Sequence, residues 1–257
     1  MFKLNSPAKR LFFVAGLLVF VGFIINAIGR KSSTNTSELR ITITDEAEAR
    51  FITKQEIRQT IIDTFQHNLG GVPIGSINVK RVEEVLERNP FIDNADVFVD
   101  ITNHVNIKIS QRKPVVRIID LRGTSYYLDE KGRYMGVSKH YTARVPVVTG
   151  FIRSDMPNLA AIDIRHPLNP LFLMVLAIQK DNFLSAQIEQ IYIDKEGEFT
   201  LITKLGDAKI LLGDAQDLVE KFKRLKIFFR EAVPYEGWTK YKTVNVKFNG
   251  QIVCEKR

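Results

Sequence analysis

An uninterrupted apolar run near the N-terminus, residues 11–28, constrains this chain more than any other feature of its sequence. The run reads LFFVAGLLVFVGFIINAI, and Asn26 is its one strongly polar side chain. As a helix rising about 1.5 Å per residue it would extend roughly 27 Å, close to the thickness of the hydrocarbon core of a bilayer. The sequence therefore predicts a single transmembrane helix over residues 11–28, after a cytoplasmic tail at residues 1–10.

A cleaved signal peptide is the alternative interpretation of this segment. Lys3, Lys9 and Arg10 would form its positive region, and Ala27 and Gly29 would supply small residues at a cleavage site. Signal peptides usually have an apolar region of about 7 to 15 residues, and this run is longer, which favours the anchor. Basic residues flank the run on both sides, so the positive-inside rule favours a cytoplasmic N-terminus only slightly.

The formal net charge of +8 at pH 7 is unevenly distributed. Residues 1–31 hold five basic and no acidic side chains, which leaves 32 basic against 29 acidic in the rest of the chain. Residues 221–257 alone hold ten basic and three acidic side chains. A local basic surface on a mildly acidic body is typical of binding to an acidic partner or to lipid headgroups, and we expect no nucleic-acid partner.

The chain beyond the apolar run, about 230 residues, is long enough for two domains. With Cys254 as the single cysteine, no intramolecular disulfide can form, so both domains depend on apolar cores. Residues 29–38 include the polar stretch SSTNTS and are predicted as a linker. The predicted domains then cover residues 39–113 and 114–257.

The first domain is predicted as a β-α-α-β-β unit. Residues 39–44 alternate apolar and polar, Thr53 and Glu56 have the spacing of a capping box, and Asn78 can cap a second helix. Strands are expected at 95–101 and 105–110 around a turn at 102–104. Two helices would then cover one face of a small sheet.

The second domain is predicted to be mostly antiparallel sheet with flanking helices. Strands are expected at 115–119, 125–128, 133–137, 188–193, 199–203 and 209–212, and a helix at 170–180. Asp214 is expected to cap an amphipathic helix that carries Leu218, Phe222, Leu225 and Phe229.

The chain ends in a predicted hairpin with strands at 243–248 and 251–255. Its turn, Asn249-Gly250, is the strongest short hairpin signal, and a two-residue turn would place Val253 on the same face as Val244. The last strand is then apolar on both faces. Either its own fold covers both faces, with Phe248 in the core, or the strand is an edge to which a partner adds a strand of its own.

Catalytic and metal-binding signatures are not found in the sequence. Four histidines are scattered without the spacing of metal ligands, and no GxSxG, HExxH or P-loop motif occurs. Cys254 is the only candidate nucleophile and has no nearby histidine, which is more typical of a structural thiol. We therefore predict no enzymatic activity, no cofactor, no metal and no small-molecule substrate.

Several motifs occur in an order that resembles the FtsQ/DivIB family of bacterial cell-division proteins. They are QRKPV at 111–115, YLD at 127–129 followed by Gly132, VPVVTG at 145–150 and ILLGDAQDLVEKFKRL at 210–225. The tail, the single span and the β-α-α-β-β unit, which is similar to a POTRA module, complete the resemblance. The chain departs from the family pattern at Gln111, where Glu is usual, and at Thr102-Asn103, where an aromatic-Pro pair is common.

The resemblance implies that the C-terminal strands hold division proteins similar to FtsB and FtsL. Lys247 and Phe248 end an NVKF segment similar to the family's DLRY, so Lys247 would pair with an acidic residue and Phe248 would fill an apolar contact. Lysine in place of arginine loses bidentate geometry, which would weaken that ion pair. The predicted partner-binding residues are Lys247, Phe248, Gly250, Ile252, Val253 and Cys254.

The predicted fold class is α+β, with a transmembrane helix, a POTRA-like domain and a C-terminal β domain. The predicted function is a divisome scaffold without enzymatic activity in the cytoplasmic membrane, with both domains outside the cytoplasm, which links early division proteins to septal peptidoglycan synthesis. A membrane-anchored peptidoglycan-processing enzyme and a POTRA-bearing accessory of protein export are the alternatives.

Overall fold

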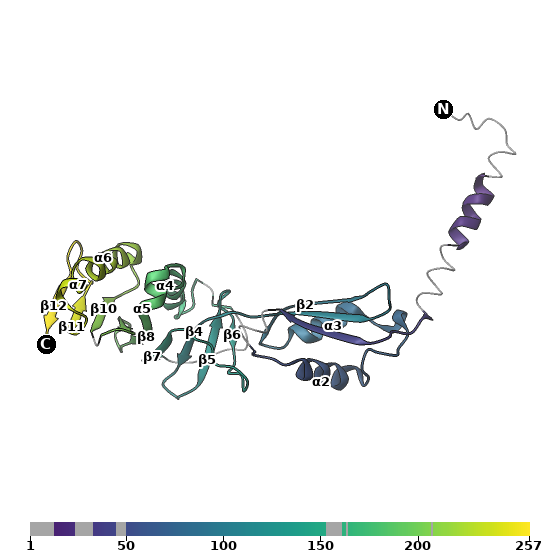
Figure 1. Cartoon of the computed structure of the whole chain (residues 1–257), viewed down its shortest axis with the longest axis horizontal. Helices are drawn as coiled ribbons and strands as arrows, with labels where there is room; N and C mark the ends of the chain where they lie inside the picture. Colours follow the sequence, from purple (N-terminus) through teal and green to yellow (C-terminus); the bar gives the residue numbers. More distant parts are fainter. Residues whose placement is uncertain (1–12, 24–32, 45–49, 153–160, 163, 207) are drawn as a thin grey trace, which may run out of the picture. The chain divides into compact units, whose positions relative to one another are not determined.

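The computed structural model describes residues 13–23, 33–44, 50–152, 161–162, 164–206 and 208–257 (Figure 1). Backbone contacts divide the chain into two compact units. The N-terminal unit comprises residues 1–48 and 52–111, and the C-terminal unit comprises residues 49–51 and 112–257.

The predicted membrane span is described only in part. Residues 13–23 form a helix, whereas residues 11–12 and 24–28 of the predicted span lie outside the described residues. Within the described ranges, no helix has the length and apolarity needed to cross a membrane.

The N-terminal unit has the predicted β-α-α-β-β order. Its elements are β1 (Leu39–Thr44), α2 (Lys54–Phe65), the short 3₁₀ helix η1 (Ile74–Ser76), α3 (Val79–Glu87), β2 (Ile92–Val99) and β3 (Val105–Gln111). The strands lie in the order β1-β3-β2, with β1 parallel to β3 and β2 antiparallel to it. This part of the predicted fold is confirmed.

Local sequence signals account for the helix starts of this unit. Thr53 and Glu56 form the predicted capping box, and the Asn78 side chain accepts from the Arg81 backbone N–H at 3.0 Å. Ile57 and Ile61 of α2 are fully buried, as the apolar stripe requires. They pack with alternate residues of the three strands in one apolar core.

The C-terminal unit is a single large sheet with helices packed against it. Its elements are β4 (Pro114–Ile119), β5 (Ser125–Asp129), β6 (Tyr134–Met135), β7 (Val147–Gly150), α4 (Asn169–Lys180), α5 (Asn182–Gln187), β8 (Ile188–Ile193), β9 (Phe199–Thr203), β10 (Lys209–Gly213), α6 (Leu218–Glu231), α7 (Val233–Glu236), β11 (Tyr241–Asn245) and β12 (Val253–Lys256). The strand order is β12-β11-β10-β9-β8-β7-β4-β5-β6. One continuous core joins α4 and α6 to the sheet.

Most strand pairs of this sheet are antiparallel, as predicted, but three are parallel. The parallel pairs are β4 with β7, β7 with β8, and β10 with β11. The last of these pairs is reached through α6, because a chain that leaves a strand and returns parallel to it needs a crossover connection. The parallel pairing of β10 and β11 positions the C-terminal hairpin beside the motif that begins at Ile210.

Three details of the sequence prediction are wrong or incomplete. The strand expected at 133–137 is reduced to Tyr134–Met135, and the elements β7, α5 and α7 were not predicted as such. Asp214 does not cap α6, because the N-cap position belongs to Asp217, whose left-handed backbone gives no side-chain capping bond. The Asp214 carboxylate binds elsewhere, as described below.

Candidate functional site

The last strand of the chain, β12, forms one edge of the nine-stranded sheet. It pairs only with β11 within the described residues, so its other side is open (Figure 1, yellow). The open side of an edge strand presents backbone N–H and C=O groups that another strand can pair with. The predicted partner-binding residues lie on this strand and on the loop that precedes it.

The predicted two-residue turn at Asn249-Gly250 is wrong. β11 ends at Asn245 and β12 begins at Val253, so residues 246–252 form a longer connection in which Gly250 has φ +74°. Val244 therefore lies opposite Cys254, one residue out of the predicted register. A shift of one residue moves every side chain of a strand to its other face.

Two backbone bonds fix the direction in which the polar groups of the hairpin point. The Val246 N–H donates to the Leu211 carbonyl of β10 at 3.1 Å. The Arg257 N–H donates to the Lys240 carbonyl at 3.2 Å. Because backbone groups alternate in direction along a strand, Thr243 and Asn245 of β11 point toward β12, and Val253 and Glu255 of β12 point toward β11. The register shifts between Tyr241 and Thr243, so Tyr241 does not follow this alternation.

The open edge therefore consists of the even-numbered residues of β12. Asn245 lies opposite Val253 and Thr243 opposite Glu255, which are the hydrogen-bonded positions of the hairpin. Cys254 and Lys256 lie between and beyond them and direct their N–H and C=O groups away from the sheet. These two residues are the ones that offer backbone pairing to another chain.

The side chains of the hairpin divide into a core face and an exposed face. Ile252 and Cys254 pack against the core, and burial raises the pKa of the Cys254 thiol. Val253 is 47% exposed and Phe248 is 48% exposed, so Phe248 is not a core residue. Exposed apolar side chains beside open backbone groups suit a protein partner.

Lys247 is engaged within the chain. Its Nζ donates to Glu198 Oε2 at 2.8 Å, and its aliphatic chain lies over Gly213. Gly213 has φ +75°, and a Cβ at this position would lie 2.7 Å from Lys247 Cδ. Glycine at position 213 therefore allows both the left-handed backbone and the close approach of Lys247.

The loop before β12 is also tied to α6. The Arg224 guanidinium donates through Nη2 to the Val246 carbonyl at 2.9 Å. One turn earlier, Lys221 is 5% exposed and donates through Nζ to both the Asp214 carboxylate, at 2.7 Å, and the Asp214 carbonyl, at 2.9 Å. The hydrogen bond from Lys221 Nζ to the Asp214 carboxylate lowers the pKa of the Asp214 carboxyl.

Sequence reasoning did not identify Gly213, Asp214, Lys221 and Arg224 as residues that shape this site. All four lie in the 210–225 motif, so the motif itself was the signal that could have found them. Glu198 carried no such signal, because it lies 49 residues before Lys247 in the chain. Residues of the 210–225 motif position the 246–248 segment, and Glu198 binds the side chain of Lys247 in that segment.

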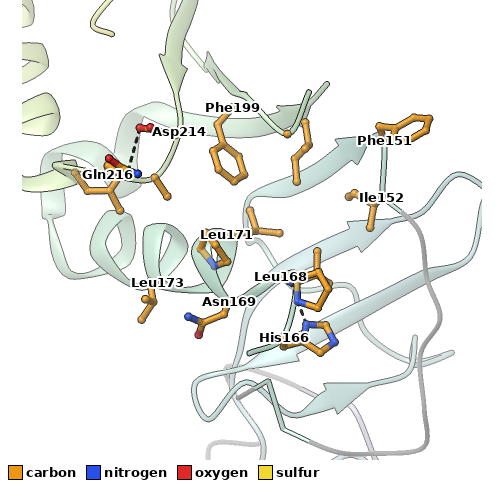
Figure 2. A pocket seen from close by; sticks show the side chains of 16 residues that line it. Phe151, Ile152, His166, Leu168, Asn169, Leu171, Leu173, Phe199, Asp214 and Gln216 are labelled. Atoms are coloured by element: carbon orange, nitrogen blue, oxygen red, sulfur yellow. Dashed lines mark hydrogen bonds between the residues drawn. The ribbon is translucent and has the colours of Figure 1, made fainter. Parts of the chain in front are cut away.

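The C-terminal unit also contains an open, largely apolar cavity of about 1170 Å³ (Figure 2). Its walls come from the start of α4, the β8–β9 turn and the segment before α6. The ring of His166 accepts from the Leu168 N–H at 3.1 Å, and the Asp214 carboxylate accepts from the Gln216 N–H at 3.1 Å. Among the residues that the structure describes, no three His, Cys, Asp or Glu side chains gather to hold a metal ion.

Both units match known protein families. Residues 113–255 match the family described as "FtsQ/DivIB, C-terminal related", and residues 34–110 match the "POTRA-like domain" family. The chain is also similar to three curated proteins, each named cell division protein FtsQ.

The alignments with all three relatives cover most of the chain. The protein of Geobacter sp. (strain M21) is 24% identical over 258 residues, which is 97% of this chain and 87% of the relative. That of Geotalea daltonii is 24% identical over 204 residues, or 77% and 70%. The protein of Rhodothermus marinus is 26% identical over 195 residues, or 71% and 67%. With more than half of its residues matched by the family of the C-terminal unit, the chain belongs to the FtsQ/DivIB family.

Proposed function

We propose that this protein is a scaffold of bacterial cell division without enzymatic activity, which holds division proteins similar to FtsB and FtsL at its C-terminal edge strand. In this role it links early division proteins to septal peptidoglycan synthesis. The observation that carries the proposal is the open side of β12, with exposed apolar side chains beside it. The similarity to relatives named cell division protein FtsQ supports a role in cell division.

Binding proceeds by strand addition. A segment of the partner pairs with the outward N–H and C=O groups of Cys254 and Lys256 and extends the sheet by one strand. Phe248 and Val253 supply apolar contacts next to it, and Ile252 and Gly250 shape the loop. The basic excess of residues 221–257 favours an acidic partner segment, with Lys247 among the cations that meet it.

The scaffold is anchored by residues 11–28 as a single membrane span. The N-terminal tail lies in the cytoplasm, and both folded units lie on the other side of the cytoplasmic membrane. A reporter enzyme fused after Arg257 should be active only outside the cytoplasm, and the mature protein should retain residues 1–10. A new N-terminus near Ser32 would show a cleaved signal peptide instead.

Two proline substitutions test strand addition. Lys256→Pro removes an N–H that points away from the sheet, so the hairpin should keep its stability while partner binding is lost. Val253→Pro removes an N–H that points to β11, so it should disrupt the hairpin itself. Both full-length variants would be purified in detergent, and their binding to the extracytoplasmic part of the cognate FtsB would be measured beside circular-dichroism melts.

The two variants separate edge pairing from simple damage to the fold. A folded Lys256→Pro protein that binds FtsB as tightly as the unsubstituted chain would contradict strand addition at β12. Lys256→Ala keeps the backbone N–H and removes the same charge, so it should bind nearly normally and serves as the matched control.

A further inference from the structure

Ile101 is the most exposed large apolar side chain among the residues that the structure describes, at 91%. It lies in the turn between β2 and β3, at one end of the N-terminal unit. Placing an isoleucine almost wholly in water is unfavourable, because burial of such a side chain is a main source of protein stability. The exposure of the Ile101 side chain therefore indicates that another molecule or surface covers it.

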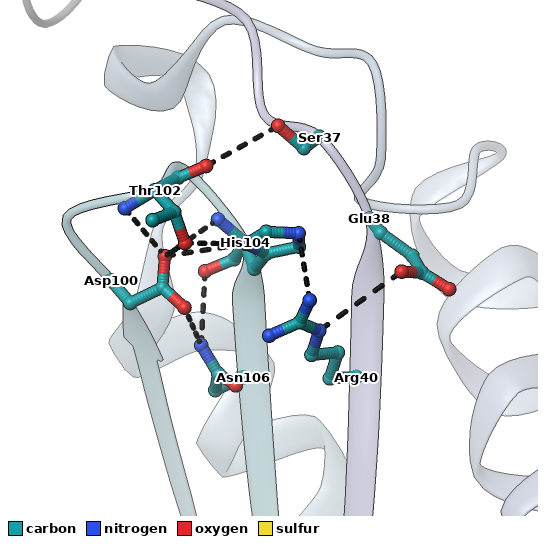
Figure 3. Close-up of polar contacts among 7 residues, drawn as sticks. All are labelled: Ser37, Glu38, Arg40, Asp100, Thr102, His104 and Asn106. Atoms are coloured by element: carbon teal, nitrogen blue, oxygen red, sulfur yellow. Dashed lines mark hydrogen bonds and ion pairs between the residues drawn. The ribbon is translucent and has the colours of Figure 1, made fainter.

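The turn that presents Ile101 is firmly held (Figure 3). The Asp100 carboxylate accepts from the backbone N–H groups of Thr102 and His104, each at 2.9 Å, and from the Thr102 hydroxyl at 2.7 Å. It also accepts from the Asn106 amide at 3.0 Å. These hydrogen bonds fix the backbone on both sides of Ile101. The Ile101 side chain therefore stays exposed to water because the turn itself is held in this conformation.

The chain enters the N-terminal unit at the same end. The Ser37 N–H donates to the Asn103 carbonyl at 2.8 Å, and the Thr36 N–H donates to the Val72 carbonyl at 2.8 Å. The entering segment thus lies between the β2–β3 turn and the loop that follows α2. Two residues before Thr36, the Thr34 carbonyl accepts from the Ile74 N–H at 2.9 Å, so residues 34–37 pack as part of this unit.

Only four residues, 29–32, separate the apolar run from Ser33, which is the first described residue after residues 13–23. Five peptide steps at about 3.5 Å each give a reach of at most roughly 17 Å. The headgroup layer on one side of a bilayer is about 6 Å thick. If residues 11–28 span the membrane, this end of the N-terminal unit lies close to the lipid headgroups.

The surface around the entry point carries no charge along its longest loop. Residues 68–79, NLGGVPIGSINV, contain no charged side chain, and neither do residues 32–37 or 101–103. Val79, at the start of α3, is 36% exposed at this end. These uncharged stretches can approach a membrane without the cost of removing charges from water, and the charged Asp100 carboxylate next to Ile101 already accepts four hydrogen bonds from its own turn and from Asn106.

We propose that this end of the N-terminal unit is a lipid-contact surface, with Ile101 inserted among the phospholipid headgroups. The proposal rests on the membrane anchor of the proposed function and adds a second point of contact to it. The contact is apolar in character, so it does not require anionic lipids and is insensitive to salt.

Nitroxide labels on the full-length chain in nanodiscs test this contact. In a Cys254→Ser background, Ile101→Cys is labelled, and Arg88→Cys, exposed at the opposite end of α3, is the control. The ratio of collision with lipid-soluble oxygen to collision with a water-soluble nickel chelate should be several-fold higher at position 101. The difference should persist in discs of phosphatidylcholine alone and at high salt.

A second pair of variants keeps the native isoleucine. A label at Ser76, in the uncharged loop, should lose lipid contact when Ile101→Asp is added. Equal collision ratios at positions 101 and 88, in a chain that stays in the disc, would overturn the lipid contact alone. Release of the whole chain from the disc at alkaline pH would overturn the anchor and the lipid contact together.

Discussion

Lys247 and Glu198 form an ion pair across the C-terminal unit, with Nζ and Oε2 2.8 Å apart. Their side chains are 35% and 47% exposed, so water screens the pair. Lys247 is also the cation that we expect to meet an acidic segment of the partner. In the free protein, Glu198 therefore pairs with the same Lys247 ammonium that we expect to pair with the partner.

Replacing Glu198 by Gln should strengthen partner binding. An exposed ion pair contributes about 0.2–1 kcal/mol, so the release of Lys247 should raise affinity by at most about five-fold, mainly through faster association. Surface-binding kinetics at two salt concentrations would measure it. Glu196→Gln removes the same charge two residues away without touching Lys247, and an equal gain in that variant would mean that net charge alone is responsible.

Gly213→Ala should reposition Lys247. The left-handed backbone costs an L-residue about 1–2 kcal/mol, and the new Cβ would also push against Lys247 Cδ at 2.7 Å. Gly197→Ala is the matched control, because Gly197 has φ +83° with nothing within 4 Å of the added Cβ. Melting temperatures should fall in both variants, and partner affinity only in Gly213→Ala. Equal binding by the two variants would contradict a role for the Lys247 position.

Phe248→Ala should weaken partner binding with little effect on the fold. The ring is 48% exposed, so its removal leaves no core cavity, whereas a central aromatic anchor contributes about 2 kcal/mol to an interface. Dissociation should become roughly thirty-fold faster at that magnitude. Tyr235→Ala, at 87% exposure, removes another surface ring and should bind normally. A large drop in melting temperature for Phe248→Ala would assign the ring to the fold instead.

Asp100→Asn should remove an acid-sensitive contribution to the stability of the N-terminal unit. Hydrogen bonds, first from the Thr102 hydroxyl and then from the His104 N–H, hold the pKa of Asp100 far below the ordinary 3.8. A folded pKa below the unfolded one stabilises the fold above about pH 4, and this contribution is lost as the pH falls toward the folded pKa. His104, whose ring lies 3.5 Å from the carboxylate, and Arg40 behind it face the same group.

Amide exchange in β2 and β3 would measure this effect between pH 6 and pH 2.5. Protection should fall with pH in the unsubstituted chain, and it should be lower but flatter in Asp100→Asn. Asp96→Asn, on the exposed face of β2, should follow the unsubstituted chain. Identical pH profiles for Asp100→Asn and the unsubstituted chain would contradict the role given to this carboxylate.

Local patterns in the sequence predicted most of the helices and strands of this protein, although β7, α5 and α7 were not among them. The alternation in residues 39–44, the capping box of Thr53 and Glu56, and the apolar stripe of α6 each involve residues within a few positions of one another. Such signals act through the backbone of a single strand or helix, so they are readable without the fold. The order of motifs was enough to identify the family.

Only the tertiary structure decided how the edge strand is presented. Asn249-Gly250 predicted a two-residue turn, but the parallel pairing of β11 with β10 and the bond from Arg224 to the Val246 carbonyl hold residues 246–252 as a longer connection. The same long-range contacts join Lys247 to Glu198. These contacts join segments that are far apart in the chain. Together they stabilise the fold more than the local turn preference of Asn249-Gly250 does, so that preference could not determine the register of β11 and β12.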